Sequence, residues 1–451
     1  MNSKNIIYLH SHDTGRYISP YGFKVRTPNL EEFAKDGVVF RNCFCASPTC
    51  SPSRAALLTG QYPHSCGMLG LAHRGFSMAN PSAHLANTLR NIGYHTCLLG
   101  IQHESDDAKI LGYDETVENR DTPWEIDELV PLAESFFSRR HDKPFFLSIG
   151  SFEAHRPFPN PDIEDDPRWL RPVPILPDTP EIRYDMATLN TSINRFDRGV
   201  GKIMAALDNS ELKDETLIII TSDHGLAFPR MKCNLTDHGI GVMLMMRGAG
   251  LCNGGRVVDS LVSHVDIFPT LCDYLEIPRN ERLQGVSLFP ILTGQSDSVR
   301  DEIFAEINAH VAYEPMRCIR THRHKYIRHL LENSHNLVMA NCDESPSKDF
   351  LITHSWNAQE IVKEELFDLY FDPQECHNLV NDPDKSGILN NLRERLDAWM
   401  LETNDPALKY GRPPVPESAI LNEQQDISPD KSPAKIDKNF MLRNEIPELV
   451  N

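Results

Sequence analysis

Short apolar runs alternate with longer amphipathic stretches over the first two thirds of the chain. The apolar runs cover residues 5–10, 94–100, 144–152, 216–222 and 241–247. Their length and continuous hydrophobicity are typical of parallel strands that are buried on both faces. The amphipathic stretches, at 27–37, 82–93, 184–210 and 264–275, have the spacing of helices that cover such a sheet. The pattern therefore predicts an α/β fold with a doubly wound, mostly parallel sheet flanked by helices.

The pattern changes near residue 300. Segments 301–307, 315–330 and 364–373 are rich in strand-forming residues, which predicts a smaller α+β domain with an antiparallel sheet. We interpret 341–349 as a surface loop and 389–403 as the last helix. Proline and polar residues dominate after residue 410, which favours an arm over the surface or a partly disordered tail. The expected units are a larger domain over 1–299, a smaller one over 300–410 and a tail over 411–451.

Composition narrows the classes of function. The 451 residues carry a net charge of −19 without a basic run, which argues against nucleic-acid binding. No run of 18 apolar residues could span a bilayer, so we expect no membrane association. The chain enters a strand-like run almost at once, with no signal-peptide pattern, so we expect a cytoplasmic protein. Its 11 cysteines, without a C-x-x-C pair, predict reduced buried thiols, with Cys50 as the exception.

Polar residues follow the predicted strands where each strand ends. They are His12, Asp13, His103, His155, Asp223 and His224. In an open α/β sheet, reactive groups gather beyond the carboxyl ends of the strands. Asp13 and Asp223 offer hard oxygen ligands for a divalent cation, and His224 offers an imidazole. The spacing leaves calcium, magnesium and manganese open.

The segment SPTCSPSRAALLTGQYP carries the most specific chemistry. Pro52 suits the first turn of a helix and residues 49–51 can cap it, so Cys50 is predicted at a helix N-terminus. Such an end binds anions through its free N–H groups and the helix dipole. Arg54 lies one turn further on, where its guanidinium can bind a tetrahedral oxyanion with two hydrogen bonds.

Cys50-Ser51-Pro52-Ser53-Arg54, followed by Leu58-Thr59-Gly60, resembles the C-x-P-S-R-x-x-x-L-T-G signature of the formylglycine-dependent sulfatases. These enzymes belong to the alkaline phosphatase superfamily, and the resemblance implies an alkaline-phosphatase-like fold. It also implies that a maturation enzyme oxidises Cys50 to formylglycine. One hydroxyl of the hydrated aldehyde would attack sulfur and the other would expel the sulfate. The expected substrate is a small sulfated compound, by default a carbohydrate.

The resemblance extends to further segments: NIIYLHSHDTG, SFEAHRPF, IIITSDHG, FPRMKCNLTDHGIGV and ELFDLYFDPQECHNL. It implies a metal site, with calcium as the expected ion, formed by Asp13, Cys50 as formylglycine, Asp223 and His224. Arg54 would stabilise the formylglycine and the sulfate charge, and His103 would act near the nucleophile as acid or base. His155 and Lys232 would donate to the sulfate oxygens or the leaving group. FPR-x-K-x-N, PMRCIRTHRHKYI and WMLETNDP most resemble the heparan N-sulfatase (sulfamidase) branch.

Three departures from the family pattern matter, and one of them is His224, where many members have Asn. His12 stands where many members have a first aspartate, so an imidazole would replace one carboxylate and the metal could differ. Gly100 is followed by Ile101, Gln102 and His103, where the family usually has Gly-Lys-x-His. Gln102 could bind substrate by a hydrogen bond but brings no charge. The missing lysine keeps open a phosphonate monoester or phosphodiester hydrolase. An inactive binding protein is disfavoured because the nucleophile and metal residues are present.

The smaller domain offers weaker candidates for a substrate pocket. They are Glu306, His310, Arg317 and Arg320. The run at 320–329 alternates like one strand with a solvated face, which favours a structural role. His64 is a further candidate of lower rank. The alternative is that it serves only to brace its loop. The tail leaves a homo-oligomer open as well, because it could reach a neighbouring subunit.

Overall fold

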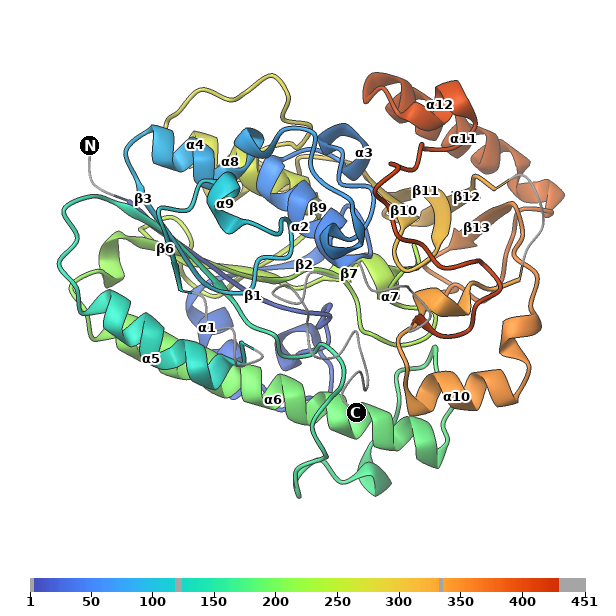
Figure 1. The fold of residues 1–451 in the computed structure, drawn as a ribbon, viewed down its shortest axis with the longest axis horizontal. Coiled ribbons are helices and arrows are strands. Elements are labelled where there is room, and N and C mark those ends of the chain that lie inside the picture. The colour runs from blue at the N-terminus through green and yellow to red at the C-terminus, as the bar shows by residue number, and fades with distance from the viewer. Residues whose placement is uncertain (1–3, 118–123, 332–335, 430–451) are drawn as a thin grey trace.

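The protein is described by a computed structural model over residues 4–117, 124–331 and 336–429. A nine-stranded sheet lies between two layers of helices, and a separate four-stranded sheet stands beside it (Figure 1). The prediction of a mostly parallel sheet and a smaller antiparallel one is confirmed.

The centre of the large sheet consists of four parallel strands in the order β3-β5-β1-β6. They are β1 (Asn5–Ser11), β3 (His95–Gly100), β5 (Phe145–Gly150) and β6 (Thr216–Ser222), and β4 (Glu115–Val117) pairs parallel to β3 at the edge. Every residue of β1, β5 and β6 is buried, as the continuous apolar runs predict.

The fifth apolar run does not form a parallel strand. It divides into β7 (Gly241–Val242) and β8 (Leu244–Gly248), and β8 runs antiparallel to β6. The chain between β6 and β8 contains only the one-turn helix α7 (Asp237–Ile240) and the two-residue strand β7, and the N–H of Met243 donates to Gly15 O just beyond β1. The chain therefore re-enters the sheet from the end at which it left. Two strands not predicted from the sequence, β2 (Val38–Phe44) and β9 (Arg256–Ser263), complete this side.

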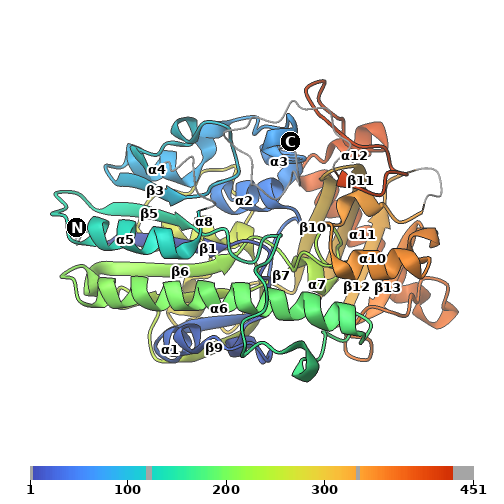
Figure 2. The same cartoon turned by 60° about the horizontal axis from the view of Figure 1, so that its bottom comes forward.

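The helices form one layer on each face of the sheet. One layer contains α1 (Pro28–Asp36), α5 (Ile126–Phe137) and the long α6 (Pro180–Asp208), which runs along the sheet in Figure 2. The other contains α2 (Cys50–Thr59), α3 (Pro63–Cys66), α4 (Leu85–Asn91), α8 (Ile267–Tyr274) and α9 (Phe289–Leu292). Ile7 and Leu9 of β1 pack on the first layer, whereas Ile6 and Tyr8 pack on the second.

The smaller sheet is antiparallel, in the order β10-β11-β12-β13. Its strands are β10 (Glu302–Ala309), β11 (Tyr313–Thr321), β12 (His324–His329) and β13 (Glu364–Asp368). Helix α11 (Ser386–Glu402) packs on it, and α12 (Pro406–Tyr410) follows. The run at 320–329 is a hairpin and not one strand with a solvated face. Lys325 is fully buried there, because its charge is paired with Asp237 and Glu375.

The segment 341–349 is not a surface loop. Ser345 accepts a hydrogen bond from Lys348 N and caps helix α10 (Pro346–Thr353). Ser347 is buried and donates to Asp185 of α6. Figures 1 and 2 both place α10 against one end of α6. The smaller domain is thus attached to the helix layer as well as to the edge of the sheet.

The described part of the tail, residues 411–429, forms an arm along the molecule. Ile420 N donates to Arg74 O and Asn422 N to Val311 O, both at 2.9 Å. The tail therefore links the large domain to the β10–β11 turn. The rest of the predicted tail, 430–451, lies outside the described residues.

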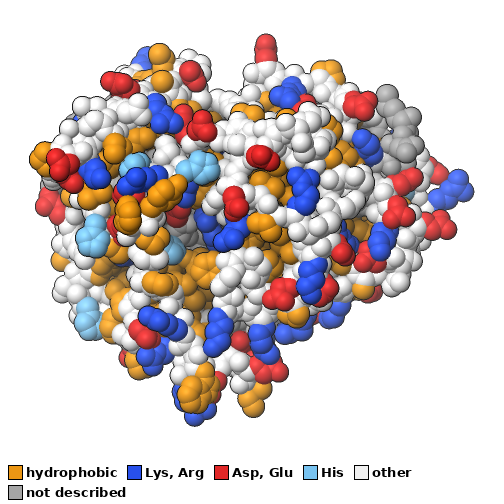
Figure 3. All heavy atoms as spheres, turned by 180° about the vertical axis from the view of Figure 1, so that it is seen from behind, with side chains coloured by type: hydrophobic (Ala, Val, Ile, Leu, Met, Phe, Trp, Pro, Cys, Tyr) orange, Lys and Arg blue, Asp and Glu red, His pale blue; other side chains and the backbone are white. Residues whose placement is uncertain are grey.

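The surface carries mixed charges. Basic and acidic side chains are interspersed on the face in Figure 3. Within the described ranges, no helix has the length and hydrophobicity needed to cross a bilayer. Most cysteines are buried and free, as expected, but Cys376 is exposed because it lies in the turn after β13.

Candidate active site

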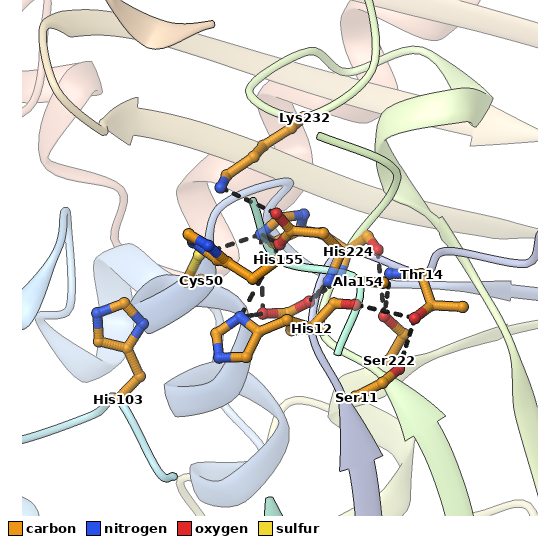
Figure 4. A network of polar contacts seen from close by, with 12 residues as sticks. Ser11, His12, Thr14, Cys50, His103, Ala154, His155, Ser222, His224 and Lys232 are labelled. Carbon is orange, nitrogen blue, oxygen red and sulfur yellow. Dashed lines mark hydrogen bonds and ion pairs between the residues drawn. The ribbon is translucent and has the colours of Figure 1, made fainter. Parts of the chain in front are cut away.

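Side chains from three strand ends and one helix start meet at the carboxyl edge of the large sheet. Figure 4 shows Cys50, His12, His155, His224 and Lys232 directed toward one another, with His103 to one side. Ligand atoms of His12, Asp13, Cys50 and Asp223 all lie within 4.8 Å of one another, and all four residues are buried. The predicted strand-end residues other than His103 therefore form one cluster with Cys50.

Cys50 is the first residue of α2, as predicted. Thr49 occupies the N-cap position in an extended conformation, but its side chain makes no capping hydrogen bond. Ser53 Oγ donates instead to the backbone carbonyl of Asp223, which fixes the helix start against the end of β6. The positive end of the helix dipole therefore points toward the cluster.

His224 lies between the Cys50 thiol and a carboxylate. Its Nε2 is 3.3 Å from Cys50 Sγ and 3.2 Å from Asp13 Oδ1. Its Nδ1 lies 2.9 Å from Gly225 O and can donate a hydrogen bond to it. That hydrogen bond fixes the ring and leaves Nε2 as the atom that faces the cluster.

Arg54 binds Asp223 and His10 within the buried part of the site. It donates from Nη2 to Asp223 Oδ2 at 2.9 Å, and its Nη1 lies 2.6 Å from His10 Nδ1. Burial alone would raise the pKa of Asp223, but the interactions with His224, Arg54 and His12 outweigh it and hold this pKa well below its usual range. Burial and the charge of Arg54 hold the pKa of His12 well below its usual range. Asp223 is therefore a carboxylate and His12 a neutral imidazole.

The cluster fits a divalent metal ion. Among the described residues, His12 Nε2 is buried and makes no hydrogen bond, and the buried Asp13 Oδ1 has only the ion-pair contact with His224 Nε2 at 3.2 Å. Buried polar atoms are nearly always satisfied, so atoms of this kind mark a place for a ligand. Two carboxylates and a neutral imidazole form a donor set that divalent cations accept.

Lys232 lies between two carboxylates. Its Nζ is 3.1 Å from Asp13 Oδ2 and 3.2 Å from Asp343 Oδ2. Burial would lower the pKa of Lys232, but Asp13 and Asp343 raise it well above its usual value, so the side chain is charged. Asp343 was not a candidate from the sequence, because it lies in the segment interpreted as a surface loop and no motif surrounds it.

His155 and His103 are both held by a neighbour. His155 Nδ1 lies 2.7 Å from Arg156 O, and its ring centroid is 5.2 Å from that of His12. His103 Nε2 lies 3.1 Å from His73 Nδ1, and the two rings stack. Asp13 and His103 adopt positive φ angles of 39° and 72°, a conformation that is uncommon for non-glycine residues but in which Asp and His are enriched.

Other candidates lie apart from the cluster or serve their own loops. The amide of Gln102 accepts from Glu104 N and Ser105 N and donates to Ser105 O, so its own turn uses it. Arg317 is fully buried and binds both carboxylate oxygens of Asp405, so it is turned away from the cluster. Arg320 pairs with Asp237.

His64 and His310 have different positions. His64 and Glu306 bind each other through the backbone N–H and the ring of His64, so His64 braces its loop. His310 is buried in the turn after β10 and acts electrostatically on Asp343. Of the candidates in the smaller domain, His310 is therefore the one that the structure brings toward Lys232.

A wound α/β sheet that gathers carboxylates and imidazoles beyond the carboxyl ends of its strands is typical of α/β enzymes, which bind their ligands at this edge. The sulfatase family profile matches residues 4–277, which is more than half of the chain. The chain therefore belongs to the sulfatase family. A profile described as N-sulphoglucosamine sulphohydrolase, C-terminal, matches residues 227–363.

Individual relatives agree with this membership. Human N-sulphoglucosamine sulphohydrolase is 28% identical, over 89% of this chain and 91% of the relative. An ulvan-active sulfatase of Formosa agariphila is also 28% identical, over 98% of this chain and 80% of the relative. The solved phosphonate monoester hydrolase of Agrobacterium radiobacter has the same fold, with a TM-score of 0.71 and 21% identity over 92% of this chain and 99% of that one. The predicted family is confirmed.

Proposed function

We propose that this sulfatase hydrolyses a sulfate ester or sulfamate of a sugar, with a formylglycine made from Cys50 and a bound divalent metal ion. The observation that carries the proposal is the position of Cys50. It starts α2, its Sγ is 3.3 Å from His224 Nε2, and it lies among the buried groups of His12, Asp13 and Asp223. A maturation enzyme must supply the oxidation.

Asp13, Asp223 and His12 would hold the metal ion, with His224 and the modified Cys50 beside them. A bound ion supplies Lewis-acid polarisation of the oxyanion and favours ionisation of a hydroxyl. Calcium is the expected ion, whereas the imidazole of His12 is a ligand that transition metals accept better than calcium does. Thermal unfolding after chelation, and after adding back calcium, magnesium or manganese, tests which ion the site prefers.

The remaining residues bind the anion and move protons. Arg54 lies beneath the nucleophile position, and Lys232 presents a charged ammonium held by Asp13. Both would stabilise negative charge on the sulfate oxygens. His155 would deliver a proton to the leaving oxygen or nitrogen, because the contact of its Nδ1 with Arg156 O fixes the orientation of the ring at the site. His103 would act near the nucleophile, oriented by His73.

The sugar is supported by the relatives. The profile over residues 227–363 and the human relative are both named for N-sulphoglucosamine, and the C-terminal segment of this chain contributes Asp343 and His310 near Lys232. Both observations favour a small sulfated amino sugar that enters a pocket between the two domains.

A phosphonate monoester hydrolase is the second candidate. The observation that favours it concerns Gln102. This residue stands in place of a sulfate-binding lysine, and its side-chain amide forms hydrogen bonds within its own turn. The test compares kcat/KM for N-sulfoglucosamine, an aryl sulfate and an aryl phosphonate, with enzyme produced alongside a maturation enzyme. We expect turnover of the sulfated compounds to dominate. Turnover of the phosphonate alone would contradict the sulfatase proposal.

A further inference from the structure

Asp343 is a charged group of the site that the proposed reaction does not use. Its Oδ2 is 3.2 Å from Lys232 Nζ, and its side chain remains 19% exposed whereas that of Lys232 is 2% exposed. Oδ2 itself is buried, so the exposure belongs to the rest of the side chain. Asp343 therefore holds Lys232 with a buried oxygen, while another part of its side chain stays open to solvent.

Asp343 contacts Lys232 and is also an electrostatic neighbour of His155, so it belongs to the same site. Burial would raise its pKa, but Lys232, His155, His310 and Arg156 outweigh burial and lower it, so the group is a carboxylate. His155 is the residue proposed to protonate the leaving group. A sugar that presents its leaving atom to His155 thus comes close to the Asp343 carboxylate.

The loop that carries Asp343 is fixed at both ends. Asn341 Oδ1 accepts from Val311 N and Ala312 N, at 3.1 and 2.8 Å, in the turn next to His310. Lys348 Nζ donates to Cys342 O at 2.8 Å. Ser347 binds Asp185, which in turn binds Arg156 beside His155. The carboxylate is therefore preorganised, as a group that recognises a substrate must be.

We propose that Asp343 is a specificity-determining residue. Its carboxylate accepts a hydrogen bond from a hydroxyl of the sugar and repels a second anionic group at that position. The substrate class is then a sulfated sugar whose ring is uncharged beside the bond that breaks. This inference rests on the proposed function.

A purely structural role makes a different prediction. If Asp343 only orients Lys232, removal of its charge lowers the turnover of every sulfated compound by a similar factor. If Asp343 selects the sugar, removal of its charge changes the ratio of kcat/KM between substrates. The reason is that the Asp343 carboxylate repels only those substrates that carry a second anionic group beside it.

The experiment measures kcat/KM for N-sulfoglucosamine, for its 3-O- and 6-O-sulfated derivatives and for 4-nitrophenyl sulfate. We expect the wild type to disfavour at least one doubly sulfated sugar by about tenfold or more. Asp343→Asn keeps the shape and removes the charge, and it should reduce that discrimination by about tenfold. Asp343→Ala also removes the acceptor, so its KM for N-sulfoglucosamine should rise above that of Asp343→Asn.

The matched control is Glu344→Gln. Glu344 is the adjacent carboxylate, is 39% exposed and pairs with Lys348 outside the site, so the substrate ratio should stay at the wild-type value. An unchanged ratio in Asp343→Asn, with all substrates slowed alike, would overturn the inference and leave the proposed function standing. A wild type that hydrolyses none of the sulfated compounds, 4-nitrophenyl sulfate included, would overturn both.

Discussion

Cys50 is a small, fully buried side chain whose importance is chemical. Cys50→Ala removes the proposed nucleophile, so turnover should disappear. The free energy of unfolding should change by only about 1 kcal/mol, because a single sulfur atom is lost. Steady-state kinetics and urea unfolding measure the two effects.

Cys66→Ala is the matched control for this change. Cys66 is also buried, and burial raises the pKa of its thiol to about 12, so it is an unreactive group. Its replacement should cost a similar amount of stability and leave turnover at the wild-type level. Activity that survives Cys50→Ala would exclude this residue as the nucleophile.

Glu153 predicts a pH dependence of stability. Burial raises its pKa from 4.5 to about 7, although Ser151 and Ile126 N donate to its carboxyl group. A carboxyl group whose pKa is raised on folding contributes stability below pH 4.5, and this contribution is lost as the pH rises through 7. Glu153→Gln should therefore be more stable than the wild type at pH 8, by at most about 3 kcal/mol, and show little advantage at pH 4.5.

Chemical unfolding of both proteins at several pH values tests this prediction. Glu134→Gln, an exposed change on the adjacent helix α5, should leave the pH profile as it is. A stabilisation by Glu153→Gln that does not vary with pH would show that ionisation of Glu153 is not its cause.

At the scale of elements, periodicity identified the segments that obey one simple pattern. The strands β1, β3, β5 and β6 are continuous apolar runs, and α6 has a long amphipathic repeat, so local sequence was sufficient. Helix α5 was missed because Pro131 interrupts its pattern. The direction of β8 could not be predicted, because it depends on the path of the loop between β6 and β8.

In the site, too, features set by local sequence could be predicted and features set by tertiary contacts could not. Strand-end residues and the Cys50 helix could be predicted, since both rules are local. Asp343 could not, because its position beside Lys232 depends on tertiary contacts of Asn341 and Ser347 with distant elements. Arg317 was a reasonable candidate by its charge, and only the fold shows that Asp405 neutralises it.

The link between α6 and the loop of His155 carries an element-scale prediction. Asp185 binds Arg156 through both oxygens, at 2.7 and 2.8 Å, and also accepts from Ser347 of α10. Asp185→Ala leaves a buried arginine without its partner, which should destabilise the protein by about 3–5 kcal/mol. It should also lower kcat, because the carbonyl of Arg156 orients His155.

Asp178→Ala is the comparison for this change. Asp178 pairs with Arg183 near the start of α6 but is 50% exposed, so its loss should leave the free energy of unfolding close to the wild-type value and kcat unchanged. Equal effects of the two substitutions on thermal unfolding would mean that the Asp185 link does not hold the two domains at the site.

At the scale of the whole molecule, the site depends on contacts between distant parts of the chain. Besides its bonds to Arg74 and Val311, the tail accepts a hydrogen bond from Lys348 at Ile427 O, at 2.7 Å. Arg74 follows His73, which holds His103, and Val311 follows His310. Removal of residues 411–451 should therefore raise KM for a sulfated sugar more than KM for a small aryl sulfate. Equal KM changes for both substrates would contradict a role of the tail in shaping the sugar pocket.

The central claim is that a residue placed at a helix start, between carboxylates and imidazoles, is converted into the nucleophile. Mass spectrometry of the peptide that contains Cys50, in enzyme of measured turnover, tests this claim most directly. We predict a peptide about 18 Da lighter than the cysteine form, in a fraction that rises in proportion to turnover across preparations. Full turnover in protein whose Cys50 remains an unmodified thiol would contradict the account.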